Sequence, residues 1–409
     1  MQQGYLSQYF QGVAAKVLSA VEADPATSNQ HEFNGARRLQ EILGPATGEK
    51  RKYQTQFIYM CDQDDEPVKD TGTLTWYYAR WNHPSRAPEA RLYYSANNSI
   101  TCASAGDNLF IALRPDDTIL AVITERGSTI GNQLKWLFGV GDETRFAIRG
   151  QQEIGEEPVE FSSRFIIEQL GIPVEESDDD HLEDMLQRFG GGFPNTRVFS
   201  EYARSTLTDV YPLDDPDAVL MNWMEREEIL FRTLEKHLIL ERLRDGFEDD
   251  VDEFVRFSLS VQNRRKSRVG QALENHVEQL MIARSIRYDR TKMTENRAKP
   301  DFIFPGIVEY HDRTFNTSLL TMLGVKSTCK DRWRQVLSEA QRIENKHLLT
   351  LETAISTNQT DEMQANHLQL IVPKQLHETY SPTQQGWLKN MYDFIEHIQF
   401  KQRCSSNGH

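Results

Sequence analysis

The sequence has few cysteines and no long apolar run. Four cysteines occur among 409 residues, far apart and without a Cys-x-x-Cys pair, at Cys61, Cys102, Cys329 and Cys404. This spacing argues against a disulfide scaffold or a cysteine zinc site and fits a reducing compartment. No segment has the length and apolarity of a transmembrane helix, and the start, M-Q-Q-G-Y-L-S-Q, lacks the features of a signal peptide. We therefore expect a cytoplasmic protein without a membrane partner.

Basic residues are outnumbered by acidic ones, and the formal net charge is −15. Taken over the whole chain, this charge disfavours binding to nucleic acid. Its distribution changes that interpretation, because residues 151–255 hold 28 Asp and Glu against 9 Lys and Arg, whereas residues 256–350 hold 18 Lys and Arg against 10 Asp and Glu. Contact with phosphate requires a local excess of cations, so the acidic average does not exclude DNA.

The length and the hydrophobic content of 38% predict about two domains. Short β runs separated by turn signals predict a small barrel or sandwich in the amino-terminal part, with strands over residues 56–60, 74–79, 91–94, 109–113 and 118–124. Residues 9–21 have the spacing of an amphipathic helix, and helical periodicity is clearest over residues 222–247. The stretch 171–192 is acidic and ends in glycines, which predicts a solvated linker.

Two predicted strand ends in the carboxyl-terminal half carry an acid and a lysine. Asp301 precedes the apolar run 302–304, and Lys326 ends the run 322–325. Glu339 lies on the apolar face of a helix predicted to follow. A buried carboxylate is costly unless a cation or a metal meets it. Two carboxylates and a lysine can together hold a divalent metal on a phosphodiester, with the lysine orienting or activating the attacking water.

Each of these residues also has an ordinary interpretation when it is taken alone. Asp301 then caps a turn, Lys326 is a solvated strand end, and Glu339 belongs to a surface ion pair. The Pro-Asp dipeptide is a weak signal, because it recurs at residues 115–116 and 216–217 in segments that resemble turns.

Longer segments of the carboxyl-terminal half carry a specific resemblance. They are N-R-R-K-S-R-V-G-Q-A-L-E (263–274), K-P-D-F-I-F-P (299–305), Y-H-D (310–312) and V-K-S-T-C-K-D-R-W-R-Q (325–335). These segments resemble the catalytic domain of the EcoRII-like restriction endonucleases, a branch of the PD-(D/E)XK nucleases. The similarity covers essentially all of residues 193–409.

This resemblance implies an α/β restriction-endonuclease-like fold and a set of catalytic residues. Asp301 and Lys326 become the core metal and water residues, Glu339 the relocated second carboxylate, and Glu274 the acid on the preceding helix. Asp301 and Glu339 are then the ligands of Mg²⁺. The chain departs from the general superfamily pattern at Val325, where an acid normally stands, and the EcoRII-like branch compensates for this with Glu339.

The resemblance also implies residues that read the target. Lys330, Asp331 and Arg332 open the predicted helix, and such side chains can donate to guanine or accept from cytosine in the major groove. Relatives with this arrangement read CC on one strand against GG on the other. The alternative interpretation is local charge pairing with Arg334.

Further DNA contacts are predicted at three places. A dense basic run is expected to dock phosphate, a tryptophan near the start of the catalytic part is a candidate wedge for unstacked bases, and an Arg-rich and aromatic loop precedes one amino-terminal strand. The corresponding residues are Arg264, Arg265 and Arg268, then Trp223, then Arg80, Trp81, Arg86 and Arg91. The alternatives are a charged helix surface, a core tryptophan and a solvated loop.

The segment E-A-R-L-Y-Y (89–94) resembles, more weakly, the effector domain at the amino end of the same family, an all-β pseudobarrel with flanking helices shared with a class of plant transcription factors. We therefore expect a multidomain protein with an effector DNA-binding domain over residues 1–170, a linker over 171–192 and a catalytic domain over 193–409. A type IIE restriction endonuclease is implied. It would be a Mg²⁺-dependent homodimer that cuts double-stranded DNA and is paired with a cognate DNA methyltransferase in a bacterial cytoplasm.

The implied target is a short palindromic or nearly palindromic site with CC/GG outer pairs, and a second copy of the site would bind the amino-terminal domain. Two alternatives are a DNA-binding regulator whose nuclease fold is catalytically silent and a structure-specific repair nuclease of the same superfamily.

Substituting Arg332 by Ala is expected to abolish sequence-specific DNA binding, because the guanidinium is predicted to contact base edges. Non-specific binding that weakens with salt should remain. Competition binding with specific and random duplexes at several salt concentrations measures both properties. An unchanged sequence preference would refute the assignment.

Overall fold

The structure, a computed structural model, describes residues 5–23, 31–64, 66–155, 161–172, 174, 179–329 and 332–406. The chain divides into two compact units, one formed by residues 1–174 with 354–357 and the other by residues 175–353 with 358–409. Within the described ranges, none of the helices has both the length and the apolar character needed to cross a membrane.

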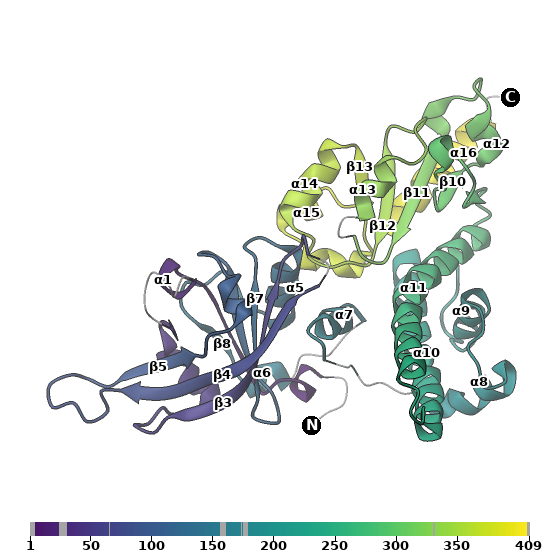
Figure 1. The fold of residues 1–409 in the computed structure, drawn as a ribbon. Helices are drawn as coiled ribbons and strands as arrows, with labels where there is room; N and C mark the ends of the chain where they lie inside the picture. The colour runs from purple at the N-terminus through teal and green to yellow at the C-terminus, as the bar shows by residue number, and fades with distance from the viewer. Residues whose placement is uncertain are drawn as a thin grey trace. The chain divides into compact units, whose positions relative to one another are not determined.

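The amino-terminal unit is built on an eight-stranded sheet with the order β2-β5-β4-β3-β7-β6-β1-β8. Strands β3, β4, β5, β7 and β8 of this sheet are labelled in Figure 1. Its strands are β1 Gly12–Val17, β2 Glu32–Phe33, β3 Arg51–Met60, β4 Val68–Ala79, β5 Glu89–Tyr94, β6 Asn108–Leu113, β7 Ile119–Thr124 and β8 Ala147–Arg149. The accompanying helices are η1 Leu6–Gln8, α1 Ala20–Ala23, η2 Ala36–Leu39, α3 Gln40–Leu43, α4 Asn98–Thr101, α5 Thr129–Phe138, α6 Gln151–Gly155 and α7 Phe161–Gln169. The pairs are antiparallel except β3 with β7, which is parallel.

The five strands predicted in this unit are confirmed as β3 to β7. The helix predicted over residues 9–21 is wrong, because β1 occupies its centre between β6 and β8. Ala14 packs into the apolar cluster on one face of the sheet, and Val13 and Ala15 pack into the cluster on the other. A strand buried on both faces reads as a continuous apolar run, which sequence periodicity cannot separate from a helix. The likeness of this sheet to an effector pseudobarrel stays a prediction.

The carboxyl-terminal unit begins with a group of helices. They are η3 Asp179–His181, α8 Leu182–Phe189, α9 Thr196–Ser205, α10 Pro216–Asp245 and α11 Val251–Ala283. The helix expected over residues 222–247 is confirmed by α10. The expected linker needs correction in its second half, because Met185 of α8 is fully buried in a cluster with Phe199 and Phe231. On this helix, Glu183 is exposed and Asp184 is half-buried, whereas residues 175–178 of the expected linker lie outside the described residues.

A five-stranded sheet of mixed direction follows, with the order β13-β12-β11-β10-β9. Its strands are β9 Asp289–Arg290, β10 Phe302–Phe304, β11 Thr321–Lys326, β12 Lys346–Thr350 and β13 Leu368–Ile371. Around it lie η4 Glu295–Arg297, α12 Ile307–His311, η5 Thr317–Leu319, α13 Arg332–Leu337, α14 Thr357–Ala365, η6 Lys374–Thr379, α15 Pro382–Gln385 and α16 Met391–Ser406. Strands and helices are interleaved as the predicted α/β class requires.

The two faces of this sheet have different neighbours. On one face, His347 of β12 lies 5.2 Å, ring to ring, from Phe394 of α16. On the other face, Gly324 of β11 lies against Val336 of α13. Because side chains alternate along a strand, Lys326 points to the same face as Gly324, away from α16.

The close contact at Gly324 generates a stability prediction. A Cβ atom there would lie 2.9 Å and 3.2 Å from the two methyl carbons of Val336, a short side chain that cannot swing away. Gly324→Ala should therefore destabilise the protein by about 1–3 kcal/mol. Gly270→Ala is the matched control, since its Cβ would meet no atom within 4 Å inside helix α11. That change should stabilise the protein by up to about 1 kcal/mol. Urea unfolding midpoints that move in the same direction for both variants would contradict this packing.

Candidate active site

The start of β10 and the end of β11 bring Asp301 and Lys326 together. The two strands are antiparallel, so Asp301, the residue just before β10, lies beside the last residues of β11. One oxygen of Asp301, Oδ2, accepts hydrogen bonds from the backbone N–H of Val325 at 2.7 Å and from Nζ of Lys326 at 2.8 Å. Asp301 is only 8% exposed. The acid and the lysine meet as the strand-end pattern predicts.

Glu339 reaches the same place from a turn. Helix α13 ends at Leu337, so the predicted helical position of Glu339 is wrong. Its backbone N–H donates to Val336 O at 3.1 Å, and the next residue, Ala340, has a left-handed φ of 46°. This conformation ends the helix before Glu339 and cannot be read from an alanine in the sequence.

The Glu339 carboxyl is electrostatically unsatisfied. Its Oε2 atom is buried and has no hydrogen-bond partner among the described residues. Burial, together with the nearby negative charge of Asp301, raises the pKa of Glu339 from 4.5 to about 7, against the opposing effect of Lys326 and Lys346. The interaction with both Asp301 and Lys326 places Glu339 in one cluster with them.

Glu274 of α11 completes the predicted catalytic set. Burial raises its pKa, a hydrogen bond from Arg290 lowers it, and the charge of Asp301 raises it again. Nη2 of Arg290 donates to Oε2 of Glu274 at 2.7 Å. Glu274 and Glu339 thus each interact with both Asp301 and Lys326, which groups the four predicted catalytic residues in one cluster. Arg290 was not predicted, because an arginine in a two-residue strand carries no local sequence signal.

The donor atoms of this cluster fit a hard divalent cation. In the described parts of the chain, no three His, Cys, Asp or Glu side chains are grouped to hold a metal ion. Asp301 and Glu339 nevertheless offer two neighbouring carboxylates, of which Glu339 has an uncommitted buried oxygen. Mg²⁺ is commonly bound by one or two carboxylates and completes its octahedral shell with water and substrate phosphate.

The residues predicted to contact DNA near this cluster have mixed outcomes. Arg332 is exposed at the start of α13, while Lys330 and Asp331 lie outside the described residues. Exposed cations also occur in the loop that leads into Asp301, at Lys292, Arg297 and Lys299. Sequence motifs alone do not single out this loop, because its cations are spaced along the chain rather than clustered.

The basic run of α11 is directed largely at its own protein, which corrects its predicted role. Arg268 is 5% exposed and forms ion pairs with Glu227 and Glu228 of α10. Arg265 pairs with the buried Glu235 at 2.6 Å. Arg264 lies over the ring of Phe193 at 4.2 Å. The acids of α10 need these cations, since an unpaired buried charge is costly.

Trp223 is a core residue in this structure. Its side chain is 1% exposed, 5.6 Å from the ring of His276 and 5.6 Å from the guanidinium of Arg204. A wedge between bases needs an accessible ring, so this burial contradicts the predicted role. Its place on the buried face of α10 is the ordinary one for a tryptophan in an amphipathic helix.

The predicted DNA-contacting loop of the amino-terminal unit keeps one accessible ring. Trp81 is 50% exposed and stacks on Tyr78 at 5.6 Å. Arg86 is exposed as well. Arg80 pairs with Glu89 at 3.4 Å, and Arg91 pairs with Glu32 at 2.9 Å and with Glu89 at 3.2 Å. Trp81 and Arg86 are therefore better placed for a ligand than the two paired arginines.

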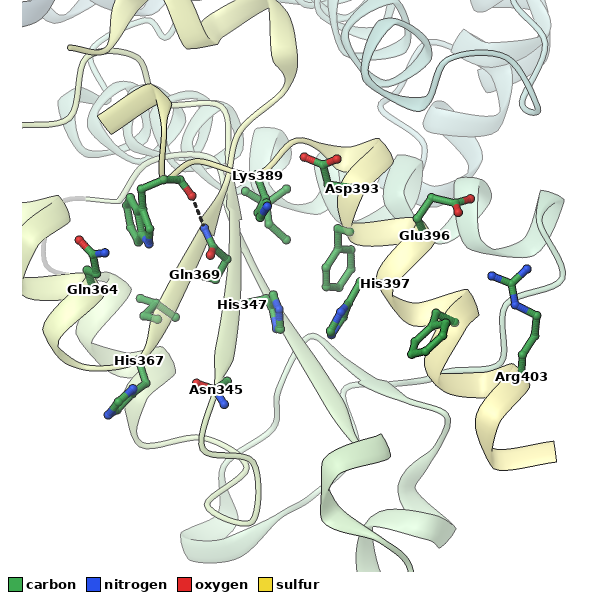
Figure 2. Close-up of a pocket in the computed structure, with 15 residues that line it drawn as sticks. Asn345, His347, Gln364, His367, Gln369, Lys389, Asp393, Glu396, His397 and Arg403 are labelled. Carbon is green, nitrogen blue, oxygen red and sulfur yellow. Dashed lines mark hydrogen bonds between the residues drawn. The ribbon is translucent and has the colours of Figure 1, made fainter. Parts of the chain in front are cut away.

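A cavity of about 740 Å³ lies away from the catalytic cluster, on the α16 face of the sheet (Figure 2). His347 and His397 stand side by side in it, with ring centres 5.5 Å apart. Burial lowers the pKa of His347 to about 3, so its imidazole is neutral at physiological pH. Lys326 points to the opposite face of the sheet, and the cavity takes no part in the cluster.

The raised pKa of Glu339 predicts a pH-dependent stability. Between its ordinary value of 4.5 and about 7, the folded protein holds a proton that the unfolded chain releases, so this residue lowers stability as the pH rises. Without added metal, Glu339→Gln should therefore gain melting temperature over the wild type at pH 8 and little at pH 4.5. Glu344→Gln, at an exposed position, is the control. An equal gain at both pH values would contradict the burial of this charge.

Comparison with known proteins finds sequence relatives of the carboxyl-terminal part of the chain. Residues 231–395 match the family model described as EcoRII C terminal. The type II restriction enzyme EcoRII of Escherichia coli is 38% identical over 229 residues, which are 56% of this chain and 56% of that protein. The type II restriction enzyme SsoII of Shigella sonnei is 30% identical over 109 residues, 24% of this chain and 35% of that protein. The chain thus spans about half or less of the length of the curated relatives it matches.

Solved structures give a weaker likeness. Metal-depleted Ecl18kI in complex with uncleaved, modified DNA has a TM-score of 0.45 at 18% identity, covering 56% of this chain and 86% of that one. The complex of the restriction endonuclease PspGI with substrate DNA has a TM-score of 0.44 at 19% identity, covering 52% and 94%. The similarity of this chain to restriction endonucleases therefore rests on the sequence matches. Glu274, Asp301, Lys326 and Glu339 all lie within the segment of this chain that matches the EcoRII C-terminal family model.

Proposed function

We propose that this protein is a type II restriction endonuclease that makes Mg²⁺-dependent double-strand cuts in DNA. The observation that carries the proposal is the meeting of Asp301, Lys326 and Glu339 in one buried cluster within the segment that matches the EcoRII C-terminal family. Two carboxylates beside a lysine form the arrangement that metal-assisted phosphodiester hydrolysis requires.

Asp301 and Glu339 would hold the Mg²⁺. When bound there, the ion would place its positive charge next to the phosphate and stabilise the negative charge that develops on it. In hydrolysis, the oxygen of a water molecule bonds to phosphorus while the bond from phosphorus to one ester oxygen breaks. The water releases one proton to solvent, and the leaving oxygen takes one proton up from solvent. Lys326 is anchored to Asp301 by its 2.8 Å contact, so its ammonium is fixed where it can orient that water. Glu339 would hold the cation as a carboxylate, so binding of the metal would be coupled to loss of the proton from this residue, whose pKa is about 7.

The DNA-binding surface is proposed to surround this cluster. Arg332, Lys330 and Asp331 would read base edges, and the exposed Lys292, Arg297 and Lys299 would contact phosphate. By analogy with the family, the target is a short palindromic or nearly palindromic site with CC/GG outer pairs.

A two-fold symmetric site demands a two-fold symmetric protein, so we propose a homodimer with one cluster for each strand. Trp81 and Arg86 of the amino-terminal unit are proposed to bind a second copy of the site and thereby activate cleavage. A cognate DNA methyltransferase would protect the DNA of the same bacterial cytoplasm.

Incubation of unmethylated plasmids of known sequence with the protein and Mg²⁺ tests the proposal. Discrete fragments are expected, with ends that map to one short site bounded by CC/GG pairs, and a plasmid with two sites should be cut faster than one with a single site. Asp301→Asn and Lys326→Ala should each lower the rate by at least about 100-fold, because the first weakens a ligand of the Mg²⁺ and the second removes the cation beside the attacking water. Asp361→Asn, an exposed position on α14, should leave the rate unchanged.

Other outcomes would point to other functions. Sequence-specific binding without cleavage at any metal concentration would indicate a catalytically silent regulator. Cleavage confined to branched or damaged DNA would indicate a structure-specific repair nuclease.

A further inference from the structure

Arg290 links the candidate active site to the helices behind it. Its Nη2 donates to Glu274 at 2.7 Å, and its Nη1 donates to Oε2 of Glu278 at 2.8 Å and to Oδ1 of Asn275 at 3.1 Å. The guanidinium also lies 5.7 Å from the ring centre of Phe302. A planar guanidinium that binds three acceptors at fixed angles leaves its first acceptor, Glu274, little freedom.

The anchors of Arg290 are themselves held in place. Glu278 accepts a hydrogen bond from the Tyr288 hydroxyl at 3.1 Å, and it forms an ion pair with Arg197 of α9. Asn275 donates to the Ser200 hydroxyl of α9 at 3.2 Å. Arg290 is therefore fixed from α9 and α11.

Strand β9 ties Arg290 to Asp301 through the backbone. Arg290 pairs in register with Phe302, the residue after Asp301. The N–H of the next residue, Thr291, donates to the Asp301 carbonyl at 3.2 Å. The position of Arg290 is thus coupled to the same chain segment that carries the central carboxylate of the cluster.

The charges of the cluster explain why such a residue is needed. Glu274 interacts unfavourably with Asp301, so a free Glu274 side chain would turn away or take up a proton. Lys326 already donates to Asp301. Of the described side chains, Arg290 is the cation in direct hydrogen-bond contact with Glu274.

We propose that Arg290 is a positioning residue that holds the Glu274 carboxylate beside Asp301 and Lys326. This inference rests on the proposed nuclease function, and it assigns Arg290 no contact with DNA or with the reacting phosphate. Side chains that orient an active-site group typically contribute about 10- to 100-fold to activity.

Steady-state cleavage by Arg290→Gln, Glu274→Gln and the double variant tests the proposal. Arg290→Gln should lower kcat by about 10- to 100-fold with little change in KM for DNA, because substrate contacts stay in place. The double variant should be no slower than Glu274→Gln, since Arg290 acts through Glu274. Arg290→Lys should recover part of kcat, because an ammonium retains the charge without the planar fork. If the double variant instead lost kcat by the product of the losses in Arg290→Gln and Glu274→Gln, the two residues would act independently and the proposal would be overturned.

Arg287→Gln is the matched control, because Arg287 is exposed, lies three residues earlier and pairs with Glu309 instead. Its kcat should equal that of the wild type, and an Arg290→Gln variant as active as this control would overturn the proposal. If Arg290→Gln does not fold, Glu278→Gln removes the far anchor and should give a smaller loss of kcat that vanishes in a Glu274→Gln background.

A crystal structure of Arg290→Gln separates this inference from the proposed function, since it is informative whether or not the wild type cleaves DNA. The Glu274 carboxylate is expected to swing away from Asp301. A carboxylate that keeps its place would overturn the positioning role, whereas a wild type that cuts no DNA would overturn only the nuclease.

Discussion

The hydrogen bonds to one carboxylate oxygen, Oδ2 of Asp301, organise the carboxyl-terminal unit. That oxygen accepts hydrogen bonds from the backbone N–H of Val325, at 2.7 Å, and from Nζ of Lys326, at 2.8 Å. A buried carboxylate is tolerated only with such partners, so the pairing of β10 with β11 and the charge pair stabilise each other. The same register that pairs the strands therefore also builds the chemical site.

The remaining acids of the cluster are less well matched, and this imbalance is what gives the site its chemistry. Glu274 has Arg290 as a partner, whereas Glu339 has a buried oxygen without a hydrogen-bond partner among the described residues. In this part of the chain, the site thus keeps a buried carboxylate oxygen that a bound cation could satisfy. A fully neutralised cluster would be more stable but would offer no place for Mg²⁺, so the unsatisfied acid is consistent with function at the expense of stability.

The sequence predicts features that depend on local order and misses those that depend on distant partners. Asp301 and Lys326 are predictable because each adjoins a short apolar strand, and β3 to β7 of the amino-terminal sheet are predictable because turn signals separate their short β runs. The end of α13 before Glu339 is not, because it depends on the left-handed conformation of Ala340. Trp223 and Arg268 were misassigned for a related reason, since their burial is decided by the packing of α10 on α11.

The charge of a sequence window is therefore not the charge of a surface. Residues 256–350 carry an excess of cations, but Arg265 and Arg268 form ion pairs with acidic residues of α10. Helix α10 lies in residues 151–255, the most acidic window of the chain. The excess of acids in residues 151–255 and the excess of cations in residues 256–350 therefore partly reflect ion pairs between two helices, α10 and α11. What remains for phosphate is the set of exposed cations next to the catalytic strands, such as Lys299 and Arg332. A positive surface confined to the strand ends would hold DNA at the cluster. The acidic remainder of the protein would repel DNA elsewhere.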